Sequence, residues 1–118
     1  MQAALYAEAA EAATEAARVM AEATGADGPQ AGLAIVDQAL ALEAASNAQD
    51  AEVAFERAVE VYSKVYGKNN WRTKQVLVAL ASLLSSQGRD REASDLKVKH
   101  KLRDTARIKG SHRARKSG

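Results

Sequence analysis

The 118-residue chain contains no cysteine, which excludes a disulfide scaffold, a zinc finger and any thiolate chemistry. It has a single proline, a single phenylalanine and a single tryptophan, and few β-branched residues. Strands are enriched in β-branched and aromatic residues, so this composition argues against an all-β domain. The length fits one compact domain.

Long apolar stretches and targeting signals are also missing. No uncharged run comes close to the roughly 20 residues that a membrane span requires. Near the N-terminus four glutamates accompany the single Arg18, whereas transit peptides are rich in arginine and poor in acids. A secretory signal needs a continuous apolar stretch, which these glutamates interrupt. We therefore expect an intracellular protein without a membrane span, and the sequence carries no address for a particular compartment.

Alanine is what the sequence has in excess. The hydrophobic content is 47%, but 27 of the residues are alanine and 22 of these lie in the first 60 positions. Alanine buries little surface, so the supply of larger apolar side chains is thin for a globular core.

Charge is distributed unevenly along the chain, although the net charge is only +2. Residues 1–60 carry 11 acidic and 2 basic side chains, while residues 61–118 carry 4 acidic and 15 basic ones. From Lys97 onward nine Lys and Arg residues accompany one acid, Asp104. Basic arms of this kind commonly meet nucleic acid, anionic lipid or acidic protein, and the plain alternative is a solvated tail.

The first 24 residues favour one long helix. Residues 2–24 lack glycine and proline and are dominated by alanine and glutamate, which are strong helix formers. Apolar residues recur in them at helical spacing: Leu5, Ala9, Ala12, Ala16, Val19 and Ala23. Gly25 is placed to end this helix, and Pro29 fits the first position of a second one.

Three further helices are predicted after the second. Ser46, followed three residues later by Gln49, has the spacing of a capping box and opens the third helix. Asn70 is placed to cap the fourth helix, and Asp90 to cap a fifth that we expect to reach Gly110. No segment carries a strand signal, so the sequence predicts an all-α protein.

The turns recur at a fixed offset of 42 residues. This offset relates Gly25 to Gly67, and Pro29 to Trp71, each of which opens the next helix. It also relates apolar residues within the helices: Ala9, Ala51 and Ala93; Ala16 and Ala58; Val19 and Val61; Ile35 and Leu77; Ala39 and Ala81; Leu42 and Leu84. Such a period indicates stacked helical hairpins, in which neighbours cover each other's apolar faces and small residues allow close approach.

The repeat resembles a known family. The stretch Asp50-Ala-Glu-Val-Ala-Phe-Glu-Arg-Ala-Val-Glu-Val-Tyr-Ser-Lys-Val-Tyr-Gly67 is similar to the second helix of a tetratricopeptide repeat, with its closest likeness in the 42-residue repeats of kinesin light chains. The following helix from Leu77 to Leu84, then Gln87-Gly88-Arg89 and Glu92-Ala93, resembles that family's helix, tight turn and next helix. The resemblance covers about residues 5–97.

This resemblance implies a short right-handed array of antiparallel helical hairpins. Residues 1–96 would form the repeat domain, made of a lone second helix and two hairpins, and residues 97–118 a basic helix extension and tail. Two departures from the pattern stand out. Ser46 occupies the place of a turn glycine that Gly88 supplies one repeat later, and Lys97 and His100 stand where Phe55 and Ala58 stand one repeat earlier.

The resemblance also implies a binding groove, because the first helix of each tetratricopeptide hairpin lines a concave surface that takes peptides or helices. The groove residues would be Val36, Asp37, Leu40, Glu43, Val78, Ala79, Ser82 and Ser85. Family members that clamp a peptide carboxylate use Lys, Arg and Asn there, and kinesin light chains show an Asn pair where Val78-Ala79 stands. Neither ligand class is therefore expected.

An apolar floor with acidic edges suits an amphipathic helix, or an apolar peptide with basic flanks. The alternative is that Val36, Leu40 and Val78 are packing residues that the chain's own neighbours cover.

The sequence shows no catalytic constellation. The only histidines, His100 and His112, lie in the basic segment without cysteine, so a metal site is not expected. Gly67-Lys68 lacks the glycine-rich loop and the following Ser or Thr of a phosphate-binding loop. Tyr66 and Trp71 are interpreted as packing residues. We expect no enzyme activity, no cofactor and no small-molecule substrate.

The basic segment 97–118 is a second candidate functional surface. Its cationic residues are Lys97, Lys99, Lys101, Arg103, Arg107, Lys109, Arg113, Arg115 and Lys116. On a helix, Lys99, Arg103 and Arg107 would form one stripe. Such clusters neutralise phosphates with an affinity that falls steeply with salt. A nuclear localisation signal and docking onto an acidic protein surface are the other interpretations.

These patterns favour a non-enzymatic scaffold or adaptor for protein–protein interaction. It would be a small subunit of a multi-subunit complex, anchored partly by its basic C-terminus. The lone first helix points the same way, because its apolar side lacks a partner. The alternative is an RNA- or ribosome-associated accessory protein that binds phosphates through residues 97–118.

Overall fold

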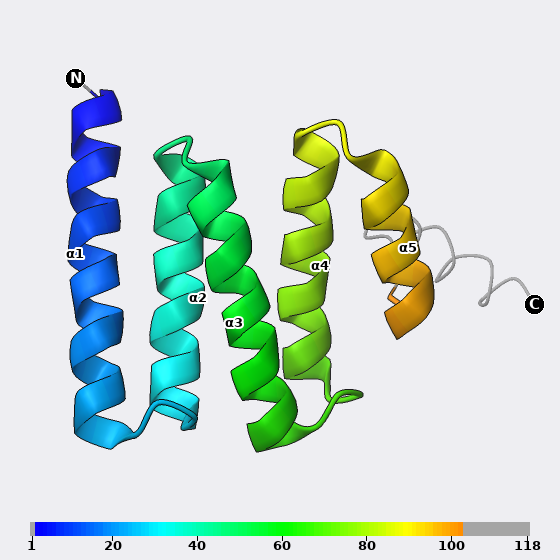
Figure 1. The fold of residues 1–118 in the computed structure, drawn as a ribbon, viewed down its shortest axis with the longest axis horizontal. Coiled ribbons are helices and arrows are strands. Elements are labelled where there is room, and N and C mark those ends of the chain that lie inside the picture. The colour runs from blue at the N-terminus through cyan, green and yellow to red at the C-terminus, as the bar shows by residue number, and fades with distance from the viewer. Residues whose placement is uncertain (1, 103–118) are drawn as a thin grey trace, which may run out of the picture.

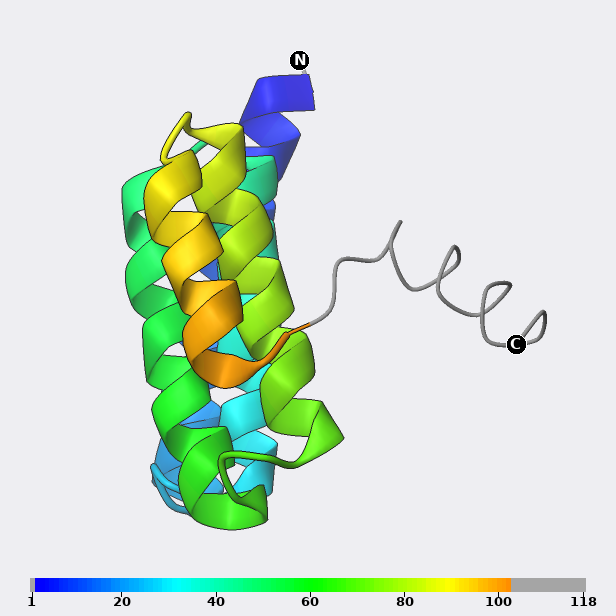
Figure 2. The same cartoon turned by 90° about the vertical axis from the view of Figure 1, so that its right-hand side faces the viewer.

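The computed structural model describes residues 2–102, which form five α-helices and, within that range, no strand. The helices are α1 (Gln2–Thr24), α2 (Pro29–Ala44), α3 (Ala48–Tyr66), α4 (Trp71–Ser86) and α5 (Asp90–His100). They stand in one row, each antiparallel to the helix before it (Figure 1). Seen from the side, α3 and α5 form one layer and α2 and α4 the other (Figure 2). The predicted all-α array of helical hairpins is confirmed.

The core lies where α3 packs between α2 and α4. Phe55, Ile35 and Leu83 are the largest fully buried apolar side chains. Small residues let the helices come close. At Gly32 of α2, an added Cβ would lie 2.6 Å from Cε1 of Tyr62, so any side chain at that position would require the Tyr62 ring to move.

The alanines of the 42-residue register contribute to this core. Five of them have at most 1% of their surface exposed: Ala39, Ala51, Ala58, Ala81 and Ala93. Their methyl groups fill the helix contacts, which explains how a chain short of large apolar residues forms a packed interior. The first-helix members of the same register, Ala9 and Ala16, are exposed instead. The apolar stripe predicted for α1 is therefore not the face that contacts α2. α2 packs on Ala10 and Ala17 instead.

The start of α4 is anchored by a buried hydroxyl. Thr73 is fully buried, and its Oγ1 lies 2.8 Å from the Gly67 carbonyl oxygen and 3.2 Å from that of Tyr62. A buried hydroxyl needs such a partner, because leaving it unpaired costs about 1–3 kcal/mol. Asn70 caps α4 as predicted, since its side chain accepts a hydrogen bond from the Arg72 N–H at 2.9 Å.

The turn before α3 differs from the prediction. Asn47, not Ser46, is the N-cap, and its side-chain oxygen accepts a hydrogen bond from the Asp50 N–H. Ser46 instead adopts a left-handed conformation with φ 65°, in the turn position where Gly88 has φ 79°. The capping-box assignment was wrong because the repeat needs a left-handed residue here, which removes Ser46 from the cap.

The fifth helix also begins and ends differently. Arg89 is the N-cap residue and Asp90 is the first residue of the helix, so Asp90 does not cap it. The helix ends at His100, where Lys101 turns left-handed with φ 55° and the Leu102 N–H donates to the Lys97 carbonyl at 2.8 Å. The predicted continuation through Leu102 is wrong. Lys97 and His100 stand where α3 has Phe55 and Ala58, which are fully buried, and both are only half-buried.

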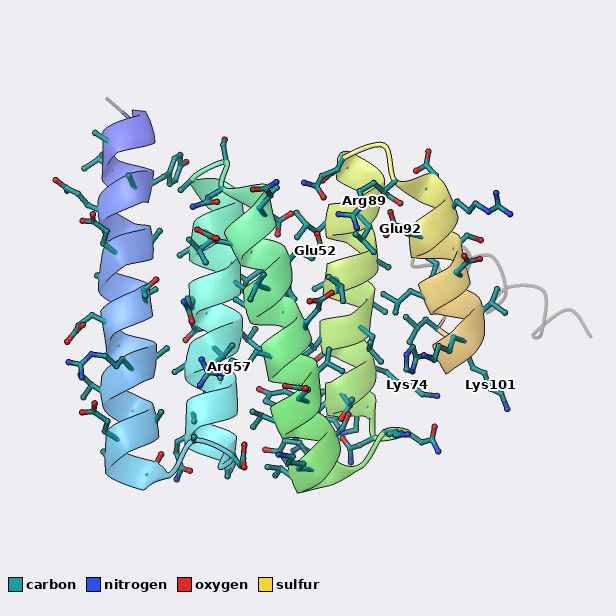
Figure 3. All side chains as sticks on the ribbon, in the orientation of Figure 1. Glu52, Arg57, Lys74, Arg89, Glu92 and Lys101 are labelled. Carbon is teal, nitrogen blue, oxygen red and sulfur yellow. The ribbon has the colours of Figure 1, made fainter. Side chains whose placement is uncertain are left out.

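A charged cluster ties the α4–α5 turn to α3. The Arg89 guanidinium donates to both carboxylate oxygens of Glu52, at 2.6 and 3.2 Å, and to both oxygens of Glu92, each at 2.7 Å. Figure 3 shows the three side chains converging between α3 and the start of α5. The hydrogen bonds from Arg89 hold the pKa of Glu92 below its usual value. This cluster links the α4–α5 turn to α3 and to the start of α5.

Candidate protein-binding groove

An open groove of about 970 Å³ runs between the two first helices of the hairpins. α2 and α4 form its walls, and side chains of α3 form its floor. The lining residues are Pro29, Gln30, Leu33, Val36, Leu40, Phe55, Tyr62, Tyr66, Trp71, Arg72, Gln75, Val76, Val78 and Ala79. The groove exists because α2 and α4 lie in the same layer, on either side of α3.

Large apolar side chains are left exposed along both walls. Leu33 and Leu40 of α2 are 56% and 49% exposed, and Trp71 at the start of α4 is 59% exposed. Leu33, Val36 and Leu40 follow one another at helical spacing, so they form a continuous stripe along the α2 wall. Exposed apolar side chains gathered in a concave surface mark an interaction site more specifically than scattered ones do.

One end of the groove is aromatic. The rings of Tyr62 and Tyr66 meet edge to face with their centroids 5.3 Å apart. The Arg72 guanidinium lies 4.6 Å from the centre of the Trp71 ring and 4.9 Å from that of Tyr66. A guanidinium over aromatic faces is attracted by their electron density, which orients both rings. This end can therefore contact apolar and planar groups of a ligand.

The two walls differ in charge. α2 carries only acids, Asp37 and Glu43, whereas α4 carries only bases, Arg72 and Lys74. Burial raises the pKa of the Tyr62 hydroxyl, and the nearby Tyr66 and the negative charge of Asp37 raise it further. Asp37 therefore lies within electrostatic reach of the groove floor. Among the described lining residues Arg72 alone is charged, and the acids of α2 lie outside the lining.

The structure brings together half of the residues predicted for the groove. Val36, Leu40, Val78 and Ala79 line it. The other four do not line it: Asp37, Glu43, Ser82 and Ser85. The groove extends instead toward the starts of α2 and α4, as far as Pro29 and Trp71, where Tyr62 and Tyr66 of α3 also line it.

Sequence reasoning missed the residues at that end. Trp71 and Tyr66 were interpreted as packing residues, but both line the groove and Trp71 is mostly exposed. Extending the predicted stripes one turn back along each helix, from Val36 to Leu33 and from Val78 to Gln75, would have found two more lining residues. The alternative, that these are packing residues covered by the chain's own neighbours, does not hold for Leu40, which is half exposed.

Only the beginning of the candidate basic surface lies within the described residues. Lys97 is half-buried on α5, and Lys99 and Lys101 are exposed. The other six predicted members lie outside the described residues: Arg103, Arg107, Lys109, Arg113, Arg115 and Lys116.

His100, at the end of α5, sits among these cations. Burial lowers the pKa of its imidazole, and the positive charges of Lys99, Lys68 and Lys74 lower it further. The neutral form of this histidine is therefore favoured at neutral pH. In Figure 3, Lys74 lies near the end of α5, which Lys101 directly follows.

Within residues 2–102, none of the helices combines the length and the apolar character needed to cross a bilayer. No group of three or more His, Cys, Asp or Glu side chains in that range is arranged to hold a metal ion.

The row of helical hairpins with an open groove along its first helices defines a helical-repeat protein. Comparison with protein families sharpens this class, because residues 32–97, more than half of the chain, match the tetratricopeptide repeat. The chain belongs to the tetratricopeptide repeat family. None of the curated proteins compared with it matches significantly. The likeness to kinesin light chains stays a prediction.

Proposed function

We propose that the chain is a non-enzymatic interaction module whose groove binds an apolar segment of a partner protein carrying basic residues. The family to which it belongs is an interaction fold, which supports the general role. The single observation that carries the specific role is the line of exposed apolar side chains along both groove walls, above all Leu33, Leu40 and Trp71. These side chains would lose contact with water when a partner docks, which is favourable by about 25 cal/mol per Å² of apolar surface.

The charge of the walls supports a partner with basic residues. Asp37 and Glu43 lie on α2 beside the groove and do not line it, so they would pair with Lys or Arg side chains at the edge of the partner, away from Arg72, with no base on α2 to compete for them. Charge complementarity of this kind contributes more to selection and to association rate than to affinity. The partner's apolar side chains would therefore supply most of the binding energy, and its charges the orientation.

The single tryptophan makes this proposal directly testable. Trp71 lies in the groove and is the only tryptophan of the chain, so its fluorescence reports on groove occupancy alone. The full chain is titrated with a synthetic peptide that has Leu and Ile at its centre and Lys at both ends. A matched peptide has Asp in place of each Lys. We expect the Lys peptide to shift the Trp71 emission to shorter wavelength, and the Asp peptide to need a much higher concentration.

A groove variant provides the control. Leu33→Glu with Leu40→Glu places charge on two exposed positions, so the fold and melting temperature should be retained while the fluorescence response is lost. The matched control is Val53→Glu, at a position of α3 that is 63% exposed and does not line the groove, which should respond like the wild type. No emission shift with either peptide, or an unchanged shift in the double variant, would overturn the proposal.

The role within a larger assembly is the second part of this proposal. Residues 97–118 would anchor the module, either on an acidic protein surface or on phosphates of RNA. Deleting them from the full chain should leave the Trp71 response to the Lys peptide unchanged while weakening anchoring. Binding to a homopolymeric RNA that disappears with the deletion, and that falls steeply with salt, would favour the RNA-associated role instead.

A further inference from the structure

The outer face of α1 is the strongest surface feature outside the groove. α1 stands at the end of the row and packs against α2 (Figure 1). In the 42-residue register it corresponds to α3, yet the matching side chains have different surroundings. Val61 and Tyr62 of α3 are 3% and 9% exposed, whereas their counterparts Val19 and Met20 of α1 are 48% and 37% exposed. α1 therefore presents, uncovered, the same face that α3 buries.

The structure itself contains the element that covers this face in α3. Val61 and Tyr62 pack on α2 at Gly32, where any side chain would require the Tyr62 ring to move. α2 thus covers α3 as an antiparallel helix that approaches closely through small residues. By the same register, the free face of α1 has the shape to receive one antiparallel helix with small and medium-sized apolar residues.

The spacing on α1 supports a helical partner. The residues of the free face follow one another in alternating steps of four and three: Leu5, Ala9, Ala12, Ala16, Val19 and Ala23. This alternation is the seam of a pair of helices that wind around each other. Leu5 is 63% exposed, so the stripe carries large as well as small apolar side chains. A helix that buried this seam would remove apolar surface along the whole length of α1.

An acidic row borders the seam on one side. Glu8, Glu11, Glu15 and Glu22 recur at helical spacing and are all exposed, and Arg18 is the only base of α1. Arg18 is already paired, because its guanidinium contacts Glu15 and donates to Glu22 at 2.7 Å. The free edge of the seam is therefore negative.

This charge decides between the possible occupants. If two copies paired through α1 in the antiparallel manner of the array, the two-fold axis would bring both acidic rows to the same side, where they repel. A parallel pair would align the two helix dipoles unfavourably. A helix with a basic row along one edge of its apolar stripe meets neither penalty.

We propose that the free face of α1, from Leu5 to Ala23, binds an amphipathic helix of another protein that carries Lys or Arg along one edge of its apolar stripe. The partner helix lies antiparallel to α1 and extends the row, and its basic residues pair with the glutamates that border the seam. This surface lies outside the groove and would give the module a second, independent partner.

The test uses two synthetic helical peptides with the full chain. Both have Leu and Ala in alternating steps of four and three, and they differ only in a row of Lys or of Glu along one edge. Binding is measured by anisotropy of a labelled peptide. We expect the Lys peptide to bind at least about tenfold more tightly than the Glu peptide, with an affinity that decreases as salt is added.

Two variants of α1 locate the binding. Ala16→Glu inserts a charge in the middle of the seam and should abolish binding, while its exposed position leaves the melting temperature unchanged. Glu8→Lys with Glu11→Lys reverses the charge of the border without touching the seam, and should reverse the preference so that the Glu peptide binds more tightly. If Ala16→Glu perturbs folding, the variant Glu8→Lys with Glu11→Lys still tests the proposal.

The two surfaces are kept apart by their readouts. Leu40→Glu in the groove should leave peptide binding at α1 unchanged, and the Lys peptide bound at α1 should not shift the Trp71 emission. Equal binding of both peptides, or no effect of the α1 variants, would overturn the proposal. So would a wild-type dimer in sedimentation equilibrium that Ala16→Glu converts to a monomer, because the occupant would then be a second copy.

Discussion

α1 and α3 have the same place in the repeat, 42 residues apart, but opposite surroundings. α3 is covered by α2 on one side and by α4 on the other, while α1, within the described residues, packs mainly on α2. The contrast is clearest at matched residues: Ala58 has no exposed surface, whereas Ala16 is exposed. A repeat therefore reproduces the face that a helix offers, and its neighbours decide whether that face belongs to the core. The matched pairs allow direct experimental tests.

The largest difference is expected for an inserted charge. Ala58→Glu buries an unpaired carboxylate and should cost at least about 3 kcal/mol, enough to abolish cooperative folding of a small domain. Ala16→Glu, the same change on α1, should shift the free energy of unfolding by less than about 0.5 kcal/mol. Urea denaturation followed by far-UV circular dichroism measures both. Equal losses in the two variants would mean that α1 is as covered in solution as α3.

The removal of a valine side chain gives the next largest difference. Val61→Ala deletes buried methyl groups and should lower the free energy of unfolding by about 2 kcal/mol. Val19→Ala removes the same atoms from a half-exposed position and should cost less than about 0.5 kcal/mol. Thermal melts of the two variants provide the measurement, and an inverted order would contradict the register on which the comparison rests.

The turns that precede two of the second helices offer a comparison with opposite signs. Gly88→Ala should destabilise the fold by about 1 kcal/mol, because φ 79° suits glycine and no neighbour restricts the space. Ser46→Gly should stabilise it by about 0.5–1 kcal/mol, since Ser46 already holds φ 65° at a cost. The midpoints of chemical denaturation of the two variants are compared with that of the wild type. A loss of stability in Ser46→Gly would show that the Ser46 side chain compensates for the strained backbone.

The smallest effect is expected at α5, which has the same place in the repeat as α1 and α3. In α5, His100 stands at the position of Ala58. The pKa of His100 is lowered in the folded chain, so the unfolded chain binds more protons below the usual value of 6.5. Stability should therefore decrease as pH falls from above 6.5 toward the folded pKa, and level off below it. His100→Gln should remove this part of the pH dependence and leave the carboxylates' part, as measured by the melting temperature across that range.

Much of the fold followed from the sequence. The 42-residue register, the cap at Asn70 and the start of α2 at Pro29 depend on local chemistry, and all three are confirmed. The cap at Asp90 and the length of α5 were not predicted correctly. Helix propensity alone continues α5 past His100, but the backbone turns left-handed at Lys101 and the helix ends there.

The groove was predicted in part. Val36 and Val78 were found because the register places them on the first helices, which form one wall each. Trp71 and Tyr66 were missed because an aromatic residue beside a turn has the same sequence pattern whether it packs in a core or lines a groove. Arg72 covers their ring faces, and that contact depends on how the end of α3 meets the start of α4.

The sequence by itself determined the class of this protein: alternating helices and turns, a fixed period, and alanines where helices must approach closely. Spacing and backbone chemistry are local, so they can be deduced from residue order. Only the tertiary structure decided which apolar faces are core, groove or open surface, because burial depends on neighbours. Val61 and Val19 carry the same side chain at the same repeat position, and the presence of α2 against one of them makes the difference.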